Sequence, residues 1–300
     1  TTSTLTLAGD NTYSGGTTIS AGALAISHAN GLGSTDGSTT VASGAQLTIS
    51  TGLTVAENIN ISGTGISNAG VINSSGAITL SGDINVVATS SIMTTGNLTF
   101  SGDLVKTSGE DATLSISTAA QLVFTNASSI ESTNNALSIT LTSDSDSSGD
   151  EVIKLGANIT TNGGNVTVNN NTQLTKYISI DTTGDADGTV TFNGDVQGYV
   201  ADENRIILTG AGEYYYYDSS NSTAYNPVAE DYGSPTAHNT LADNGTIRLG
   251  DGILGWTGSQ YTWTPDYSGD VEYLVVGGGA SGTRGQHGEY FGGGGGGGAV

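Results

Sequence analysis

The sequence has no cysteine, only three prolines and only six basic residues. Without cysteine the chain is not a small disulfide-stapled secreted domain, whereas a long stacked β structure needs no disulfides. The missing cysteine also fits export as an unfolded chain across bacterial membranes. With 28 acidic residues the net charge is −22, and such a field repels phosphate backbones and anionic lipid headgroups. We therefore expect neither nucleic acid nor membrane insertion as a mode of action.

A long hydrophobic run and a signal peptide are also missing. No stretch approaches the ~18 apolar residues of a membrane helix. Thr1 already lies at the start of a strand-like pattern, so no leader is visible. We expect the chain to be processed or to be part of something longer.

Glycine, with 47 residues, dominates the composition together with Ser, Thr and Asn. Such a mixture can indicate disorder, but disordered segments lack regular apolar alternation. Here Val, Ile and Leu recur at every second position within short runs, with Thr on the expected solvent side. No stretch has the apolar period of a helix. The pattern predicts an all-β fold.

One phrase in the sequence is repeated. ITLSGDI at positions 78–84 returns as LTFSGDL at 98–104, and INISG at 59–63 is a weaker copy one step earlier. A strand followed by a Gly-Asp turn at this period indicates a β-solenoid with coils of about 20 residues. The period predicts that Leu80 lies under Phe100 and that Gly82-Asp83 and Gly102-Asp103 are stacked turns.

The segment LTLAGDNTYSGGTTISAGALAIS at residues 5–27, with GAQL at 44–47 after it, resembles the strand repeat of autotransporter passenger domains. TNGGNV at 161–166 and TVTFNG at 189–194 are similar to the repeats of filamentous-haemagglutinin-type adhesins. Residues 262–300, where WTP precedes LVVGGG, resemble the glycine-rich domains of bacterial adhesins and phage tail fibres. These resemblances imply a right-handed parallel β-helix on the bacterial cell surface.

Composition divides the chain into three parts. We expect a β-solenoid over residues 1–210, a tyrosine-rich boundary or insertion over 211–245, and a smaller β-strand and glycine-rich region over 246–300. EYYYYD at 213–218 breaks the alternation, and a run of glycines fills 292–298. Strand alternation would bury Tyr214 and Tyr216 and expose Tyr215 and Tyr217.

The main candidate metal site is a calcium site in the loop DTTGDADGT at residues 181–189. Asp181, Asp185 and Asp187 supply carboxylates, the oxygen ligands that Ca²⁺ prefers, and Gly184 and Gly188 allow a tight wrap. The alternative is a solvated turn, in which Asp and Gly are ordinary residues. A second acidic loop at 144–151 is a weaker candidate. We expect no other cofactor.

We find no catalytic pattern. VVGGGASG at 275–282 imitates a dinucleotide motif, but no helix can begin in the glycines that follow. Carbohydrate-cleaving β-helices need paired carboxylates, whereas the polar strand positions here are Thr, Ser and Asn. We therefore expect a non-enzymatic surface fibre, stalk or adhesin segment that self-associates end to end or continues a longer chain, with surface glycans as further partners. The alternatives are a phage tail-fibre segment and a polysaccharide-processing enzyme.

Overall fold

The computed structural model describes residues 3–146, 151–176, 178–194 and 196–198, and beyond them only isolated strands. These strands belong to one compact unit, Thr1–Pro265. The described part is all-β, apart from the 3-10 turn η1 (Ile66–Asn68), and none of its helices is long and apolar enough to cross a membrane. The expected glycine run at 292–298 lies outside the described residues.

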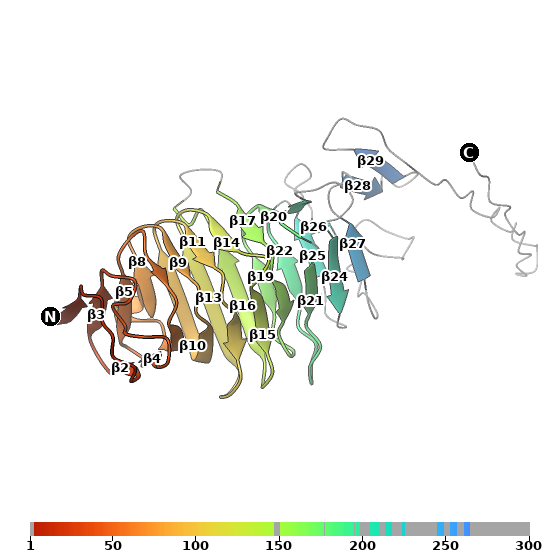
Figure 1. Cartoon of the computed structure of the whole chain (residues 1–300). Helices are drawn as coiled ribbons and strands as arrows, with labels where there is room; N and C mark the ends of the chain where they lie inside the picture. Colours follow the sequence, from red (N-terminus) through yellow and green to blue (C-terminus); the bar gives the residue numbers. More distant parts are fainter. Residues whose placement is uncertain are drawn as a thin grey trace, which may run out of the picture. The chain divides into compact units, whose positions relative to one another are not determined.

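The strands stack as a parallel β-solenoid with three faces, as the sequence predicted (Figure 1). The first face consists of β1 (Thr4–Leu7), β3 (Ala23–Ile26), β5 (Gln46–Ile49), β8 (Ile72–Ser74), the C-terminal part of β10 (Ile84–Thr94), β13 (Ala112–Thr118), β16 (Leu137–Thr142), β19 (Val166–Val168), β22 (Val190–Phe192) and β25 (Tyr214–Tyr217).

The second face contains the strand that completes each coil. It consists of β2 (Thr17–Ile19), β4 (Ser38–Val41), β7 (Asn58–Gly63), the N-terminal part of β10, β12 (Leu104–Lys106), β15 (Ser129–Ser132), β18 (Asn158–Thr160), β21 (Ile178–Asp181) and β24 (Arg205–Thr209).

The third face is a separate sheet of seven strands, so the solenoid has seven complete three-sided turns. Its strands are β6 (Thr54–Val55), β9 (Ile78–Leu80), β11 (Leu98–Phe100), β14 (Leu122–Phe124), β17 (Ile153–Leu155), β20 (Thr172–Leu174) and β23 (Val196–Gly198).

Coil length varies more than the repeated phrase suggests. Leu80 pairs with Phe100, which confirms the predicted register. Phe100 then pairs with Phe124, and Phe124 pairs with Leu155, so each of these steps along the chain is longer than the one before it. The extra residues lie in the turns between faces, where insertions are tolerated because they leave strand pairing unchanged.

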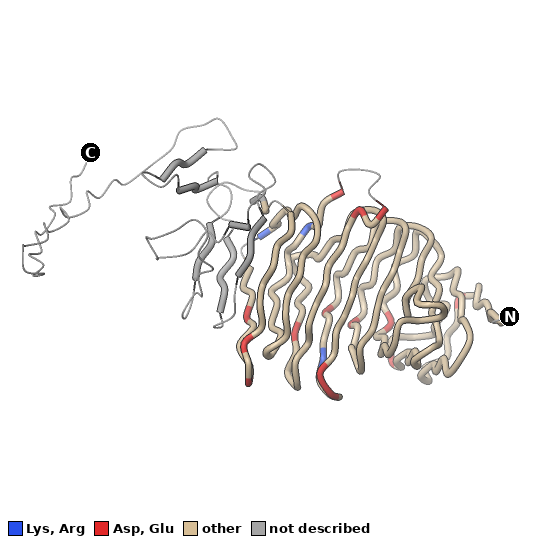
Figure 2. Tube along the Cα trace, turned by 180° about the vertical axis from the view of Figure 1, so that it is seen from behind, with Lys and Arg blue, Asp and Glu red and all other residues tan. Residues whose placement is uncertain are grey.

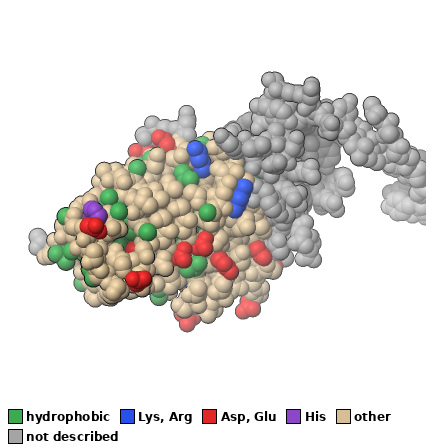
Figure 3. Space-filling model, in the orientation of Figure 1, with side chains coloured by type: hydrophobic (Ala, Val, Ile, Leu, Met, Phe, Trp, Pro, Cys, Tyr) green, Lys and Arg blue, Asp and Glu red, His purple; other side chains and the backbone are tan. Residues whose placement is uncertain are grey.

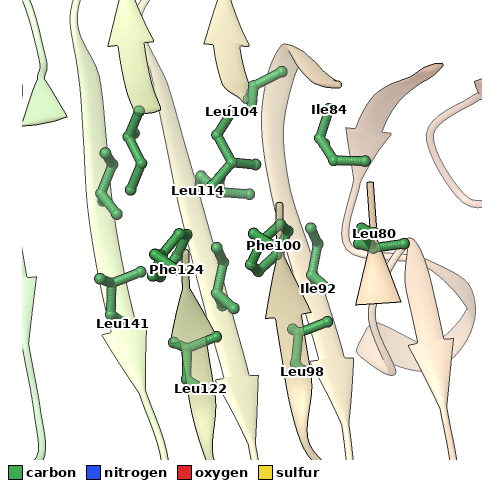
Figure 4. Packing of buried hydrophobic residues seen from close by; sticks show 14 of the residues in the cluster. Leu80, Ile84, Ile92, Leu98, Phe100, Leu104, Leu114, Leu122, Phe124 and Leu141 are labelled. Atoms are coloured by element: carbon green, nitrogen blue, oxygen red, sulfur yellow. The ribbon is translucent and has the colours of Figure 1, made fainter. Parts of the chain in front are cut away.

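The core is the interior of the prism. Along most strands, every second side chain points inward and is buried, as the alternation predicted. Leu80, Phe100 and Phe124 follow one another in a row from coil to coil (Figure 4). The rings of Phe100 and Phe124 stack with centroids 5.0 Å apart and planes 7° apart, a geometry that adds about 0.5–1.5 kcal/mol beyond burial.

Glycines lie where the turns of successive coils stack. A Cβ added at Gly102 would overlap the carbonyl oxygen of Gly82, and one at Gly188 would overlap that of Gly164. At the first of these corners the amide of Asp103 donates to Oδ1 of Asp83 at 3.0 Å. The predicted stacking of the two Gly-Asp turns is therefore confirmed.

The parallel arrangement changes beyond β24 and β25. β26 (Ala224–Tyr225) pairs antiparallel with β25, and β27 (Gly245–Arg248) pairs antiparallel with β24. β28 (Ile253–Trp256) and β29 (Tyr261–Thr264) form a separate antiparallel pair. Within the segment expected to be a boundary, β25 still extends the first face, with Tyr214 and Tyr216 in the register of Val190 and Phe192.

A matched pair of glycine substitutions tests the stacked corner. We expect Gly102→Ala to destabilise the solenoid by about 1–3 kcal/mol, because its methyl group would overlap the backbone of the neighbouring turn. Gly15→Ala is the control, since no atom lies within 4 Å of its added Cβ. Thermal unfolding followed by circular dichroism compares the two, and equal melting temperatures would show that Gly102 is not tightly packed.

Candidate functional site

In the predicted calcium loop Asp181 is the last residue of β21, and Asp185 and Asp187 lie in the turn before β22. Oδ1 of Asp181 accepts hydrogen bonds from the amide of Thr183 at 2.9 Å and from its hydroxyl. Oδ1 of Asp187 accepts from the amide of Gly184 at 3.1 Å, and Asp185 is exposed. Within the described ranges, no three His, Cys, Asp or Glu side chains are grouped so that they could hold a metal ion.

Calcium binding at this loop therefore stays a prediction. If the loop closes on the ion, millimolar calcium should raise the melting temperature, because a ligand that binds only the folded state stabilises it. Asp185→Asn should abolish the shift, and magnesium at the same concentration serves as the control ion. A melting temperature that does not respond to calcium would refute the site.

Polar side chains form ladders along the outside of the corner between the third and second faces. Oδ1 of Asn58 accepts from the amide of Asp83 at 2.8 Å, and Oδ1 of Asp103 accepts from the amide of Ser129 at 2.7 Å. With the Asp83–Asp103 bond, these side chains link successive coils. Each carboxylate accepts a backbone N–H, so the ladder has a structural role.

Two further columns of polar residues are buried inside the prism, where the sequence predicted an apolar interior of Val, Ile and Leu. Most of these hydroxyls, and the amine of Lys106, donate to the turn that follows their own strand, whereas Thr118 donates to the carbonyl of Gly96 in the turn of the preceding coil. Oγ1 of Thr161 donates to the carbonyl of Gly164 at 2.6 Å, and Oγ1 of Thr94 donates to that of Gly96 at 2.9 Å. The columns are Ser74, Thr94, Thr118 and Ser143 on one side and Lys106, Ser132, Thr161 and Thr182 on the other.

These columns have a sequence signal that alternation alone does not reveal. At several of these positions a Ser or Thr follows the last buried apolar residue of the strand at the next inward position, and a glycine comes shortly after it, as in Thr94-Thr95-Gly96 and 161–164. No glycine follows in the same way after Thr118 or Ser132. The turn carbonyls at these corners point inward and have no strand partner. A buried hydroxyl supplies the donor that they need.

A matched valine pair tests this role. Thr161→Val keeps the side-chain shape but removes the donor to Gly164, so we expect a loss of about 1–3 kcal/mol, the usual cost of an unsatisfied buried acceptor. Thr160→Val changes the adjacent residue, which points outward and makes no side-chain hydrogen bond in the described structure. If the two variants unfold at the same temperature, the buried hydroxyl contributes nothing.

Two buried side chains are ionisable. Burial lowers the pKa of Lys106, although Asp111 and Glu110 oppose this, and its Nζ donates to the carbonyls of Ser108 at 2.8 Å and Gly109 at 3.3 Å. Burial raises the pKa of Glu57, which a hydrogen bond from Thr39 at 3.4 Å partly offsets.

Glu57 lies in the turn between β6 of the third face and β7 of the second face, and is 4% exposed. Its second oxygen, Oε2, is buried with no hydrogen-bond partner in the described structure. A buried carboxylate with one weak partner costs free energy, so the protonated form is favoured in the fold. The stabilising contribution of Glu57 is fully present below its unfolded pKa and is lost as the pH rises through the higher folded pKa.

Glu57→Gln should therefore unfold at the same temperature as the native chain, or higher, at pH 7, because the amide carries no charge to desolvate. Any increase in melting temperature over the native chain should become smaller as the pH falls toward 4, where native Glu57 is itself protonated. Glu131→Gln, at an exposed position on β15, is the control. A destabilisation by Glu57→Gln at pH 7 that vanishes at low pH would mean that the charged form is the stabilising one.

The outward side of the first face is the most regular polar surface of the described solenoid. Ser115, Thr140, Thr167 and Thr191 occupy one column in consecutive register across β13, β16, β19 and β22. Columns of Ser, Thr and Asn flank it on both sides, and none of these positions is charged. Most of the described chain is tan in Figure 2, with acidic residues in separate red segments, and Figure 3 shows a mainly uncharged polar surface on the side in view.

The N-terminal segment packs on the second coil. Nδ2 of Asn11 donates to the carbonyl of Gly31 at 2.8 Å, and the amide of Ser34 donates to the carbonyl of Tyr13 at 2.9 Å. A Cβ at Gly33 would overlap the carbonyl oxygen of Tyr13 and crowd its ring. The NTYSGGTT motif thus joins β1 to β2 and also holds the first coil on the next.

Comparison with known proteins agrees with this placement. Residues 2–26 match the family model of the passenger-associated-transport-repeat. The matched segment covers β1, β2 and β3, so it spans the first coil and the start of the second. The repeat and the parallel solenoid together fit an autotransporter passenger. No curated protein and no solved structure matches the chain.

Proposed function

We propose that this chain is a non-catalytic segment of an extracellular fibre, stalk or adhesin on the bacterial surface. The observation that carries the proposal is the position of the transport-repeat match, which lies on the first coil of a continuous parallel solenoid. Function in this proposal is mechanical. Seven turns at ~4.8 Å per coil make a rod roughly 34 Å long in which each coil contacts only its neighbours.

The interior supports a mechanical role. It is continuous from Ile19 to Val196, and its charged members, Glu57 and Lys106, each make hydrogen bonds to residues close to them in the fold. Since coils stack on their neighbours, folding can begin at one end and propagate coil by coil. This suits a chain that is exported unfolded and folds outside the cell.

Surface display tests the proposal. The full chain is placed between a signal peptide and an autotransporter translocator, and intact cells are treated with protease. We expect the chain to be cleaved from outside and to be detected by antibody on unpermeabilised cells. The same fusion without the translocator is the control and should stay protected. Protection of the complete fusion, under conditions in which a known passenger is exposed, would contradict the proposal.

We further propose that the solenoid pairs end to end through β1, with a second copy or with a continuation of the same chain. Among the described strands β1 pairs only with β3, and Leu5 within it is 64% exposed. A strand edge with unpaired main-chain groups invites a further strand. Light scattering should show association that grows with protein concentration, whereas a constant monomer mass would argue against pairing.

A further inference from the structure

The outward Ser, Thr and Asn columns of β13, β16, β19 and β22 are called the array below. Coil stacking alone does not require the unpaired hydroxyls in its central column. The hydroxyls of Ser115, Thr140, Thr167 and Thr191 point outward and make no hydrogen bond within the described structure. Neighbouring coils are ~4.8 Å apart, so these hydroxyls repeat at the coil spacing without bonding one another. They form a row of unpaired donors and acceptors at a fixed spacing.

The flanking columns complete a two-dimensional array. One begins each strand and the other ends it, and some of their members are joined from coil to coil, as in the bond from Nδ2 of Asn193 to Oδ1 of Asn169 at 2.9 Å. These links hold the side chains in fixed positions. The columns are Thr113, Ser138, Asn165 and Thr189 on one side and Ser117, Thr142, Asn169 and Asn193 on the other.

The array is neutral on a molecule of net charge −22. Asp83 and Asp103 lie at the corner where the second face begins, Glu131 is an outward residue of the second face, and the third face carries Lys154. A partner that approaches the first face therefore meets no charged side chain in the array. An anionic polymer would still be repelled by the surrounding field, so the partner that fits is uncharged.

The area of the array further limits the kind of partner that it can bind. Four coils and about five residues of strand give an area of about 14 Å by about 13 Å, or roughly 190 Å². A stable protein–protein contact needs about 800 Å² from each partner, so the array is too small to hold a second copy of the chain by itself. A few sugar units of an extended glycan need no more area than this.

We propose that this array binds an extended neutral polysaccharide, an inference that rests on the proposed surface location. Ring hydroxyls of the glycan would donate hydrogen bonds to the unpaired hydroxyls of the central column and accept hydrogen bonds from them. The Asn amides and the Ser and Thr hydroxyls of the flanking columns would make further hydrogen bonds. Each contact is weak, because both groups leave water to make it. Binding becomes appreciable because a polymer presents the same unit repeatedly to many displayed chains.

The test is a pull-down of the full chain with insoluble cellulose and insoluble chitin, and with cross-linked alginate as an anionic polymer. We expect binding to at least one neutral polymer, little binding to alginate and no weakening by added salt, since no charges meet. The variant Thr140→Val/Thr167→Val removes two free hydroxyls and should bind roughly tenfold more weakly. Thr79→Val/Thr99→Val, at outward positions of the third face, is the matched control and should bind as the native chain does.

Several outcomes would overturn the inference. The inference is wrong if the chain binds neither neutral polymer, if it prefers alginate, or if both double variants lose binding equally. It is also wrong if altering the array changes the mass of the free chain instead of its glycan binding. Melting curves of both variants check that they are folded. Failure here is separable from failure of surface display, because a displayed chain that binds no glycan refutes only the array, and a chain that binds but is not displayed refutes only the proposed location.

Discussion

Main-chain hydrogen bonds between coils impose one condition on this structure, which is that every residue of a strand must have a partner directly beside it in the next coil. The amide of Ser101 donates to the carbonyl of Leu80 at 2.9 Å, and one coil later the amide of Thr125 donates to that of Phe100 at 3.0 Å. These bonds fix the coil spacing near ~4.8 Å. The corners must then stack at the same spacing, which leaves no room for a Cβ at positions such as Gly102 and Gly188. The high glycine content follows in part from this condition.

The same condition explains the polar interior. A strand amide and carbonyl are satisfied by their neighbours, but a turn carbonyl that points inward has none. A buried hydroxyl supplies the missing donor to such a carbonyl. Thr182 donates to the carbonyl of Gly188 at 2.9 Å, and Ser132 donates to that of Asn135 at 2.7 Å. Lys106 occupies the equivalent register and reaches two carbonyls, at the cost of burying an ammonium group. The interior is therefore apolar along the strands and polar at two of its corners.

Some features of the fold and of the candidate site could be predicted from the sequence, and others could not. The repeated phrase predicted the register of Leu80 with Phe100 correctly, because identical strands and turns occupy identical places in a stack. It did not predict the much longer step from Phe124 to Leu155, since turn length leaves no mark on strand alternation. Alternation does place Lys106 inward after Leu104, but composition makes a buried lysine look improbable. For Asp181 and Asp187 the sequence showed carboxylates near one another and could not show that each accepts an amide of its own loop.

Stacking also governs where charge is placed. Two like charges at ~4.8 Å repel by about 1 kcal/mol even in water, so a column of identical acids would be destabilised. Asp83 and Asp103 are neighbours in one column, and each accepts a backbone amide from the following coil. In the next column Thr160 separates Glu131 from Asp181. Repulsion thus accounts for sparse charge on any face, but the second face shows that acids can be accommodated. Coil stacking alone therefore does not require the array on the first face to be uncharged, and the neutral partner proposed for it is compatible with that composition.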